Sequence, residues 1–310
     1  MWRYILKRLL MIVFVVAGVA ILIFTIMYFV PGDPAQVILG SGATPEQLAY
    51  KRHEMGLDQP FMTQLLNYLN GLIHLDFGTS YAYGTSVWSE LQVRMPRTLL
   101  LSVLVIIVQV VVGIPLGITA AVHAGKWQDS AAIVVSMIGI AIPGFWLALM
   151  CVMLFSVKLG WLPGYGIDSW KCWIMPVLTS SLVGFAMNAR QTRASMLDVI
   201  HSDFITTARA KGVKEHDVIY KHALPNALIP VITMIGSNFA TSLGGSVIAE
   251  SVFSMPGVGL YMTNGINNLD YAVVRSSVVL LAVWFSVIML VTDLVYAFVD
   301  PRIKAQYIGR

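Results

Sequence analysis

Two carboxylic acids lie in or beside stretches of the sequence that are otherwise free of charge, and they are the first candidates for chemistry. Glu250 follows the uncharged run 227–249, and Asp293 interrupts the apolar run 276–299. An acid in a long apolar helix is a candidate functional residue, because it is costly to bury and can carry a proton or contact a polar solute. Two simpler interpretations stay open: Glu250 touches the edge of a membrane, and Asp293 bonds to a neighbouring helix.

Motifs for covalent catalysis and cofactor binding are missing from the sequence. It has no G-x-x-x-x-G-K-[ST] phosphate loop and no H-E-x-x-H zinc motif, and the G-x-G at 164–166 does not follow a strand. Cys151 and Cys172 indicate neither a disulfide framework nor a metal site. The histidines are His53, His74, His123, His201, His216 and His222. They lie in loops or at the ends of apolar runs, so no buried Ser–His pair results. We expect no catalytic residue, metal site or cofactor in this chain.

The elements that carry these residues are long apolar runs. Of the 310 residues, 57% are apolar and 12% are charged, whereas a soluble domain has about 25% charged residues. A helix of roughly 20 apolar residues spans the hydrocarbon core of a membrane, and no period-two alternation indicates a barrel. The six runs cover residues 9–30, 98–122, 130–157, 173–189, 227–249 and 276–299. We therefore predict an all-α integral membrane protein with six transmembrane helices.

Two glycine–proline motifs fall inside these runs. Gly113-x-Pro115-x-Gly117 lies in the second run, and Pro143-Gly144 lies in the third. Such residues interrupt a span where neighbouring helices or water satisfy the freed backbone groups. Small residues also permit close packing of two helices. Interruption and packing are both open interpretations of each motif.

The distribution of Lys and Arg predicts the orientation of the chain. Six spans place both termini on one side, and most of the 20 cations fall on that side, which the positive-inside rule identifies as cytoplasmic. These cations are Arg3, Lys7, Arg8, Lys126, Arg190, Arg193, Arg209, Lys211, Lys214, Lys221, Arg302, Lys304 and Arg310. This distribution accounts for the net charge of +4, so no nucleic-acid partner is implied.

The loop after the first run carries helical signals of its own. Thr44 precedes Pro45 and stands three residues before Gln47, which predicts a capping box, and Gly56 can end that helix. The apolar residues of the following segment fall on one helical face: Phe61, Leu65, Tyr68, Leu69 and Leu72. We expect residues 1–97 to form the first span plus an extracytoplasmic helical cap, and residues 98–310 to form the core. The cap lies on the membrane or over a pore mouth, or equally packs on neighbouring spans.

The loop 190–226 has the pattern of a docking surface. It carries six cations and a short helix that Asp203 can cap and that Gly212 can end in the left-handed conformation. A second short helix is expected to reach about Ala223. Small Ala positions flanked by Arg209 and Lys211 suit a helix that fits a groove of another protein. A helix lying on anionic lipid fits the charge but leaves the Ala–Gly–Pro pattern unexplained.

The loop resembles a known motif. The spacing of Ala208, Gly212, Leu224 and Pro225 is similar to the EAA loop of ATP-binding-cassette importer permeases. Five further motifs resemble the dipeptide/oligopeptide/nickel branch: PGDP at 31–34, DFGTS at 76–80, GIPLG at 113–117, ESVFSMPG at 250–257 and DPR at 300–302. Thr206 and Thr207 replace the Glu and Ala of the general motif, and His222 replaces an aliphatic residue.

This resemblance, which covers the whole chain, implies a B-type permease with the type I importer fold in the cytoplasmic membrane of a bacterium or archaeon. It implies a related C-type permease, two cytoplasmic ATPases that bind ATP and Mg, and an extracytoplasmic solute-binding protein as partners. The implied ATPase-coupling residues are Thr207, Ala208, Arg209, Ala210, Lys211, Gly212, His222, Leu224 and Pro225. Candidate residues of the translocation pathway are Asn238, Glu250 and Asp293.

The implied substrate is a dipeptide or oligopeptide, and a nickel or metallophore importer of the same family is the alternative. A rival from another class is an ion-coupled secondary transporter that uses Glu250 and Asp293 as proton carriers. That rival needs no ATPase and leaves the loop 190–226 unexplained. A membrane enzyme is a second rival, and it would require a catalytic dyad that the sequence does not show.

Overall fold

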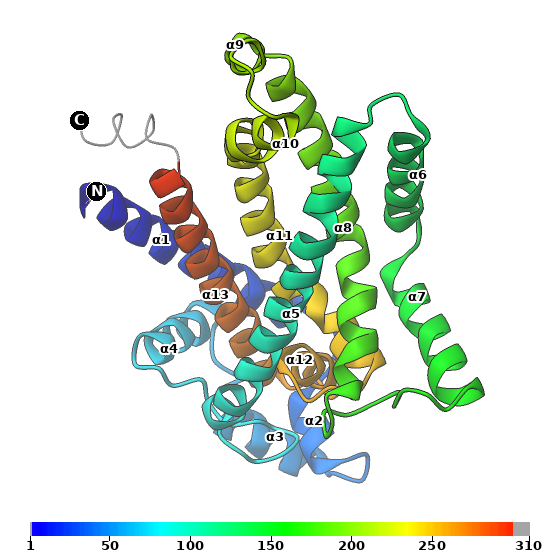
Figure 1. The fold of residues 1–310 in the computed structure, drawn as a ribbon. Coiled ribbons are helices and arrows are strands. Elements are labelled where there is room, and N and C mark those ends of the chain that lie inside the picture. Colours follow the sequence, from blue (N-terminus) through cyan, green and yellow to red (C-terminus); the bar gives the residue numbers. More distant parts are fainter. Residues whose placement is uncertain (1, 300–310) are drawn as a thin grey trace. The chain divides into compact units, whose positions relative to one another are not determined.

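The computed structural model describes residues 2–299, and in that range the regular elements are helices (Figure 1). The motif at 300–302 and the cations Arg302, Lys304 and Arg310 lie outside the described residues. Five helices are long and apolar enough to cross a membrane, or six if one bent pair is a single span. The five stretches are Ile5–Phe29, Val87–Val122, Lys171–Ile200, Glu215–Gly244 and Tyr271–Tyr296. The prediction of an all-α membrane protein is confirmed.

The third apolar run is the bent pair. Helix α6 (Trp127–Ala141) meets α7 (Gly144–Cys151) at an angle of 92°, and a π-helical segment η1 (Val152–Lys158) continues α7. Ile142 is extended, with ψ 122°, because the ring of Pro143 disfavours the helical conformation of the preceding residue. Of the two interpretations open for Pro143-Gly144, interruption of the span is therefore the one that the structure supports.

The second run is not interrupted. Helix α5 (Val87–Val122) passes unbroken through Pro115, so the interpretation of Gly113-x-Pro115-x-Gly117 as a break is wrong. A Cβ at Gly113 would lie 2.7 Å from the carbonyl oxygen of Phe185 in α8 (Lys171–Ile200), and one at Gly117 would lie 2.5 Å from that of Ala189. The motif is thus a surface of small residues against which α8 packs closely.

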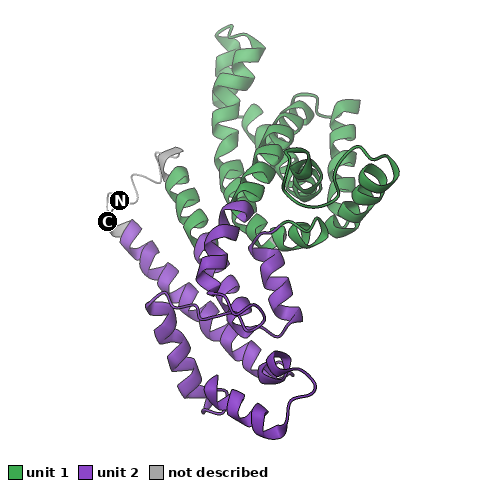
Figure 2. Ribbon diagram, turned by 90° about the horizontal axis from the view of Figure 1, so that it is seen from below, with its two compact units in different colours: residues 1–4, 99–255, 285–310 green, residues 5–98, 256–284 purple. Residues whose placement is uncertain are grey.

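The chain divides into two compact units (Figure 2). Unit 1 comprises residues 1–4, 99–255 and 285–310, and unit 2 comprises residues 5–98 and 256–284. The expected division into 1–97 and 98–310 differs from these units in that residues 256–284 group with the N-terminal part. The division at residues 97 and 98 stays a prediction about domain organisation.

Unit 2 contains most of α1 (Trp2–Phe29) and the helical loop that follows it. The loop helices are α2 (Pro34–Leu39), α3 (Pro45–Glu54) and α4 (Phe61–Ile73). The capping box of α3 is confirmed, because the Gln47 amide donates to Thr44 Oγ1 at 3.3 Å and the Thr44 amide donates to Gln47 Oε1 at 2.9 Å. Gly56 follows α3 with φ +65°. Unit 2 also holds α12 (Val258–Asn267) and the first half of α13 (Tyr271–Val299).

Helix α4 packs on the first span. The ring of Phe24 in α1 lies 5.6 Å from that of Phe61 and 5.4 Å from that of Tyr68, and Leu65 is buried. These three α4 residues belong to the apolar face expected from the sequence. Of the interpretations open for this helix, packing on a neighbouring span is therefore the one the structure supports.

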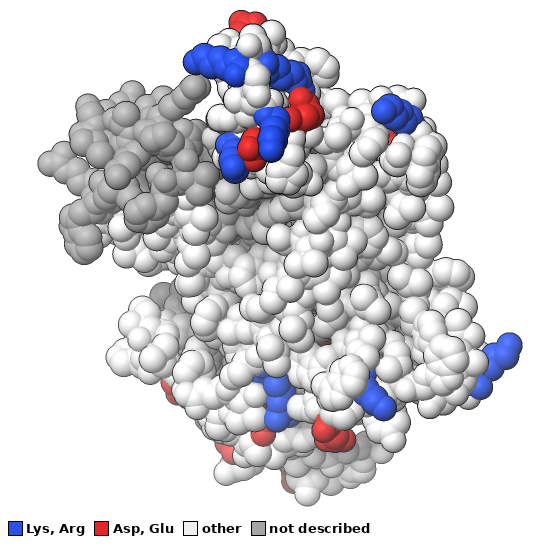
Figure 3. All heavy atoms as spheres, viewed as in Figure 1, with Lys and Arg blue, Asp and Glu red and all other residues white. Residues whose placement is uncertain are grey.

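Unit 1 is organised around α8, which contacts α6, α7 and α11 (Leu224–Val252). The short helices α9 (Asp203–Ala210) and α10 (Glu215–Asp217) lie together at one end of α8 and α11 (Figure 1). Lys and Arg side chains gather over this end (Figure 3). That distribution is the one that the positive-inside rule predicts for a cytoplasmic end.

Labelling of single cysteines tests the predicted orientation. Cysteines in place of Tyr83 and Tyr165, which are 55% and 75% exposed, are expected to react with an impermeant maleimide added to intact cells. Cysteines in place of Ala124 and Lys214, which are also exposed, should react only after the cells are opened. The native Cys151 and Cys172 are first changed to serine. Reaction of the Lys214 position in intact cells would contradict the model with both termini in the cytoplasm.

Candidate functional site

The candidate site is built on α9, whose two faces differ. Ile205 is fully buried in a cluster with Met196 of α8 and Val218, and Ala208 packs at the edge of that cluster. Thr207 and Ala210 lie on the opposite face and are exposed. The short helix is thus anchored by one face and presents the other, which is small and polar, to the surroundings.

The residues predicted to begin and end α9 are only partly confirmed. Gly212 has φ +79°, so it ends the helix in the left-handed conformation as predicted. The expected capping role of Asp203 is wrong, because Ser202 occupies the N-cap position and makes no side-chain capping bond. Asp203 is instead the first helical residue, where its negative charge is favourable beside the positive end of the helix dipole.

Arg209 holds the turn after α9 in place. Its Nη2 donates to Glu215 Oε1 at 2.7 Å, its Nε donates to Glu215 Oε2 at 3.1 Å, and its Nη1 donates to the Ile200 carbonyl at 3.4 Å. A bidentate pair of this kind fixes geometry as well as charge. Arg209 therefore links the end of α9 to the start of α10 and to the end of α8. Glu215 was not among the predicted site residues, although opposite charges on either side of Gly212 could have suggested the pair.

The second helix of the loop does not stop at Ala223. Helix α10 runs into a π-helical segment η2 (Val218–Ala223) and then into α11, with Pro225 in its first turn. A proline ring clashes with the carbonyl four residues earlier in a regular helix, and here that residue, Lys221, lies in the π-helical segment. The loop motif is thus continuous with the fifth span. Likewise, α8 extends to Ile200, so the first part of the expected loop 190–226 is helical.

The predicted coupling residues are mostly at the surface. The exposed ones are Thr207, Arg209, Ala210, Lys211, Gly212, His222 and Pro225, and the half-buried ones are Ala208 and Leu224. Two exposed aromatic residues, Phe204 at 49% and Tyr220 at 47%, were not predicted. Exposed aromatic side chains are common at protein contacts, so both join the candidate surface.

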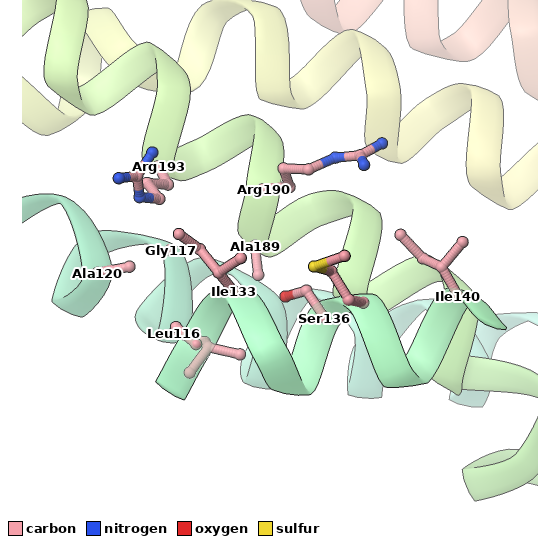
Figure 4. Close-up of a pocket in the computed structure, with 11 residues that line it drawn as sticks. Leu116, Gly117, Ala120, Ile133, Ser136, Ile140, Ala189, Arg190 and Arg193 are labelled. Carbon is pink, nitrogen blue, oxygen red and sulfur yellow. The ribbon is translucent and has the colours of Figure 1, made fainter. Parts of the chain in front are cut away.

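A buried ion pair braces this end of unit 1. Arg193 of α8 bonds to Asp129 of α6 at 2.5 and 2.7 Å, and Asp129 is 4% exposed. The Gly125 amide donates to the same carboxylate at 3.0 Å. Beside the pair, α5, α6 and α8 enclose a cavity of about 190 Å³ with apolar walls. Arg190 and Arg193 leave α8 in different directions there (Figure 4).

Asn238, a pathway candidate, is part of a chain of hydrogen-bonded polar groups. Its Nδ2 donates to Asn188 Oδ1 at 3.0 Å, and Asn188 Nδ2 donates to the Gln109 carbonyl at 3.4 Å. Asn188 is fully buried and Gln109 is 4% exposed. The three residues come from α11, α8 and α5, so the contact could not be read from any single segment.

The two candidate acids lie in different settings. Glu250 is 1% exposed, so the interpretation of an acid that merely touches the membrane edge is wrong. It lies twelve positions after Asn238 in α11, which corresponds to about 18 Å along the helix axis. Asp293 is half-buried in α13, one residue after Thr292. A Cβ at Gly236 of α11 would collide with the side chain of Thr292, so α13 and α11 approach closely there.

Replacing Glu250 by glutamine tests its role. Because the carboxylate is buried, we expect the neutral variant to lose about 1–3 kcal/mol of stability and to be recovered in smaller amounts as assembled complex. Uptake per assembled complex should match the parent protein. Blue-native electrophoresis measures the amount and a filter assay measures uptake. Normal assembly with reduced uptake would instead assign Glu250 to the pathway.

Comparison with known proteins defines the class. Residues 113–305 match the family described as binding-protein-dependent transport system inner membrane component, and residues 1–102 match the N-terminal membrane component of such systems. The chain therefore belongs to this family. It is a multi-pass inner-membrane permease subunit of an ATP-binding-cassette importer of the peptide/glutathione branch, and it is not itself an enzyme.

Glutathione permeases match nearly the whole chain. The glutathione transport system permease protein GsiC of Salmonella choleraesuis (strain SC-B67) is 40% identical over 98% of this chain and 99% of its own length. GsiC of Escherichia coli (strain K12) is 39% identical over the same shares. A chain of the inward-facing MetNI methionine ABC transporter has a TM-score of 0.58 at 20% identity, over 68% of this chain and 96% of that chain. The last likeness concerns the fold alone.

Proposed function

We propose that this chain forms one half of the membrane pathway of an importer for short peptides, including peptides of the size of glutathione. The observation that carries the proposal is the 40% identity to a glutathione permease along essentially the full length of both chains. The partners are a second, related permease, two cytoplasmic ATPases and an extracytoplasmic solute-binding protein. Asn238 and Asp293 are the proposed pathway residues, and the buried Glu250 is proposed to hold helices together rather than to contact the solute.

In this proposal α9 is the mechanical link to an ATPase. Its outer face, with Thr207 and Ala210, seats in a groove of the ATPase, while Ile205 and Ala208 hold its inner face to α8 and η2. Arg209 clamps the following turn through Glu215. Because η2 continues into α11, a displacement of α9 reaches two spans at once. The chain converts movement of the ATPase into movement of helices and performs no covalent step.

Uptake into proteoliposomes tests the proposal. The permease is co-expressed with its second permease and ATPases, the purified complex is supplied with ATP inside the vesicles, and the solute-binding protein is added outside. We expect ATP-dependent uptake of radiolabelled dialanine or glutathione, and none with a non-hydrolysable ATP analogue. ATP-dependent uptake of nickel–histidine without peptide uptake would favour the metallophore alternative. Uptake by the lone chain driven by a proton gradient would establish a secondary transporter instead.

A further inference from the structure

Unit 2 contains a cavity of about 420 Å³ near the end of the first span. Its walls come from α1, from the start of α2, from α3, from Leu57 and Gln64, and from the first turns of α13. The aromatic lining residues are Phe24, Tyr28 and Tyr271, and the charged ones are Asp33, Arg52 and Arg275. The cavity therefore combines apolar walls with two cations and one anion.

The charges of Asp33 and Arg52 compensate each other. Arg52 Nη2 and Nε donate to Asp33 Oδ2 at 2.7 and 3.1 Å, and the Ala35 amide donates to Asp33 Oδ1 at 3.1 Å. The hydrogen bond from Arg52 lowers the pKa of Asp33, so this carboxylate stays ionised. One positive charge of the cavity, that of Arg275, remains without an opposite charge.

Arg275 is half-buried and surrounded by rings. Its guanidinium carbon lies 5.0, 5.3 and 5.6 Å from the ring centres of Phe24, Tyr68 and Tyr271, and its Nε donates to the Tyr271 carbonyl at 3.1 Å. Within residues 2–299 no carboxylate lies within ion-pair distance of it. Ring faces compensate a cation only in part, so the site is suited to an anion.

The ring of Tyr68 beside Arg275 carries another donor. The hydroxyl of Tyr68 is buried and has no hydrogen-bond partner among the described residues. Burial raises the pKa of Tyr68 to about 12, so the hydroxyl stays protonated and able to donate. Tyr68 does not line the cavity, so the donors available to an anion there are the unused N–H groups of Arg275, and a guanidinium binds phosphate oxygens well.

The position of the cavity indicates where such an anion comes from. Phe24, Tyr28 and Val30 lie at the end of the first span, where the chain leaves the hydrocarbon, and Tyr28 and Phe29 are 43% and 75% exposed. Aromatic residues gather at the level of lipid headgroups. Only 11% of the most apolar stretch of α1 is buried, so acyl chains have an apolar surface beside the cavity.

We propose that this cavity binds the phosphate of a phospholipid headgroup, with Arg275 as its principal ligand, Arg52 at the rim and the acyl chains along α1. With both termini in the cytoplasm, the lipid belongs to the outer leaflet. The bound lipid would fasten the helical cap to the first span. This assignment concerns unit 2 alone and is independent of which solute the importer carries.

Native mass spectrometry of the purified transporter complex tests the proposal. Phosphatidylglycerol is titrated against a glucosyl diacylglycerol with the same acyl chains and no phosphate. We expect retention of phosphatidylglycerol only, and a loss of about tenfold or more in its affinity in R275Q, equivalent to about 1.4 kcal/mol. R275K should lie between the two, because lysine keeps the charge and loses the planar donors. K51Q, which removes a cation of α3 outside the cavity lining, is the control.

Each other outcome overturns the assignment. This comparison of the two lipids uses the parent protein. Equal retention of the phosphate-free lipid would show that the cavity does not distinguish phosphate from a sugar headgroup. Unchanged binding in both R275Q and R275K would remove Arg275 as the ligand. Displacement of the lipid by millimolar glycerol 3-phosphate would show that a free phosphate suffices and that the acyl chains play no part. Displacement by glutathione, with loss of uptake in R275K, would assign the cavity to the solute carboxylate instead.

Discussion

Replacing Ala210 by glutamate is expected to abolish ATP-driven uptake while the permease still reaches the membrane. Ala210 lies on the exposed face of α9, opposite the buried Ile205, so the larger side chain does not disturb the chain's own packing. If that face seats in an ATPase groove, an unpaired charge there costs roughly 2–5 kcal/mol, which weakens association about 30-fold or more. Co-purification of the ATPases and vesicle uptake measure the two effects.

Two other variants of the same helix separate docking from folding. A210S adds one small polar group and should retain both ATPase binding and uptake. A208E places its charge at the edge of the buried cluster around Ile205, so the amount of folded permease should fall as well. Normal ATPase binding and uptake by A210E would show that this face of α9 is not the coupling surface.

Replacing Gly117 by alanine is expected to destabilise the permease at least as much as the same change at Gly113, the other glycine of α5. The new Cβ would lie 2.5 Å from the Ala189 carbonyl oxygen and 2.6 Å from Thr192 Cβ, and backbone atoms of α8 cannot yield as a flexible side chain can. Overpacking of this kind costs about 1–3 kcal/mol. The melting temperature of the purified protein in detergent should fall accordingly.

Gly244 of α11 supplies the matched control. It also lies inside a long helix, but a Cβ there would meet nothing within 4 Å. Alanine has the higher helix propensity, by about 1 kcal/mol, so G244A should be neutral or slightly stabilising. A melting temperature of G117A at or above that of G244A would show that α5 and α8 do not approach as closely as described.

The features that the sequence alone determined are properties of short segments. A run of apolar residues is long enough to span a membrane whatever surrounds it, and a proline excludes the helical conformation of the residue before it, as at Ile142. The capping box of Thr44 and Gln47 and the left-handed turn at Gly212 likewise depend on a few consecutive residues. The loop motif around Gly212, together with the shorter motifs elsewhere in the chain, was enough to indicate the family.

Other features depended on the register between helices that are distant in sequence. Whether Gly117 marks a break or a contact is decided by the α8 backbone beside it, and the link from Asn238 through Asn188 to Gln109 joins three helices. Which face of α9 is buried depends on Met196 and Val218. That Arg275 has aromatic rings beside it is recognisable only once α1 and α4 pack around it. Local patterns define each helix and its caps, but packing decides which polar groups of distant segments become partners, because such contacts depend on the distances between segments.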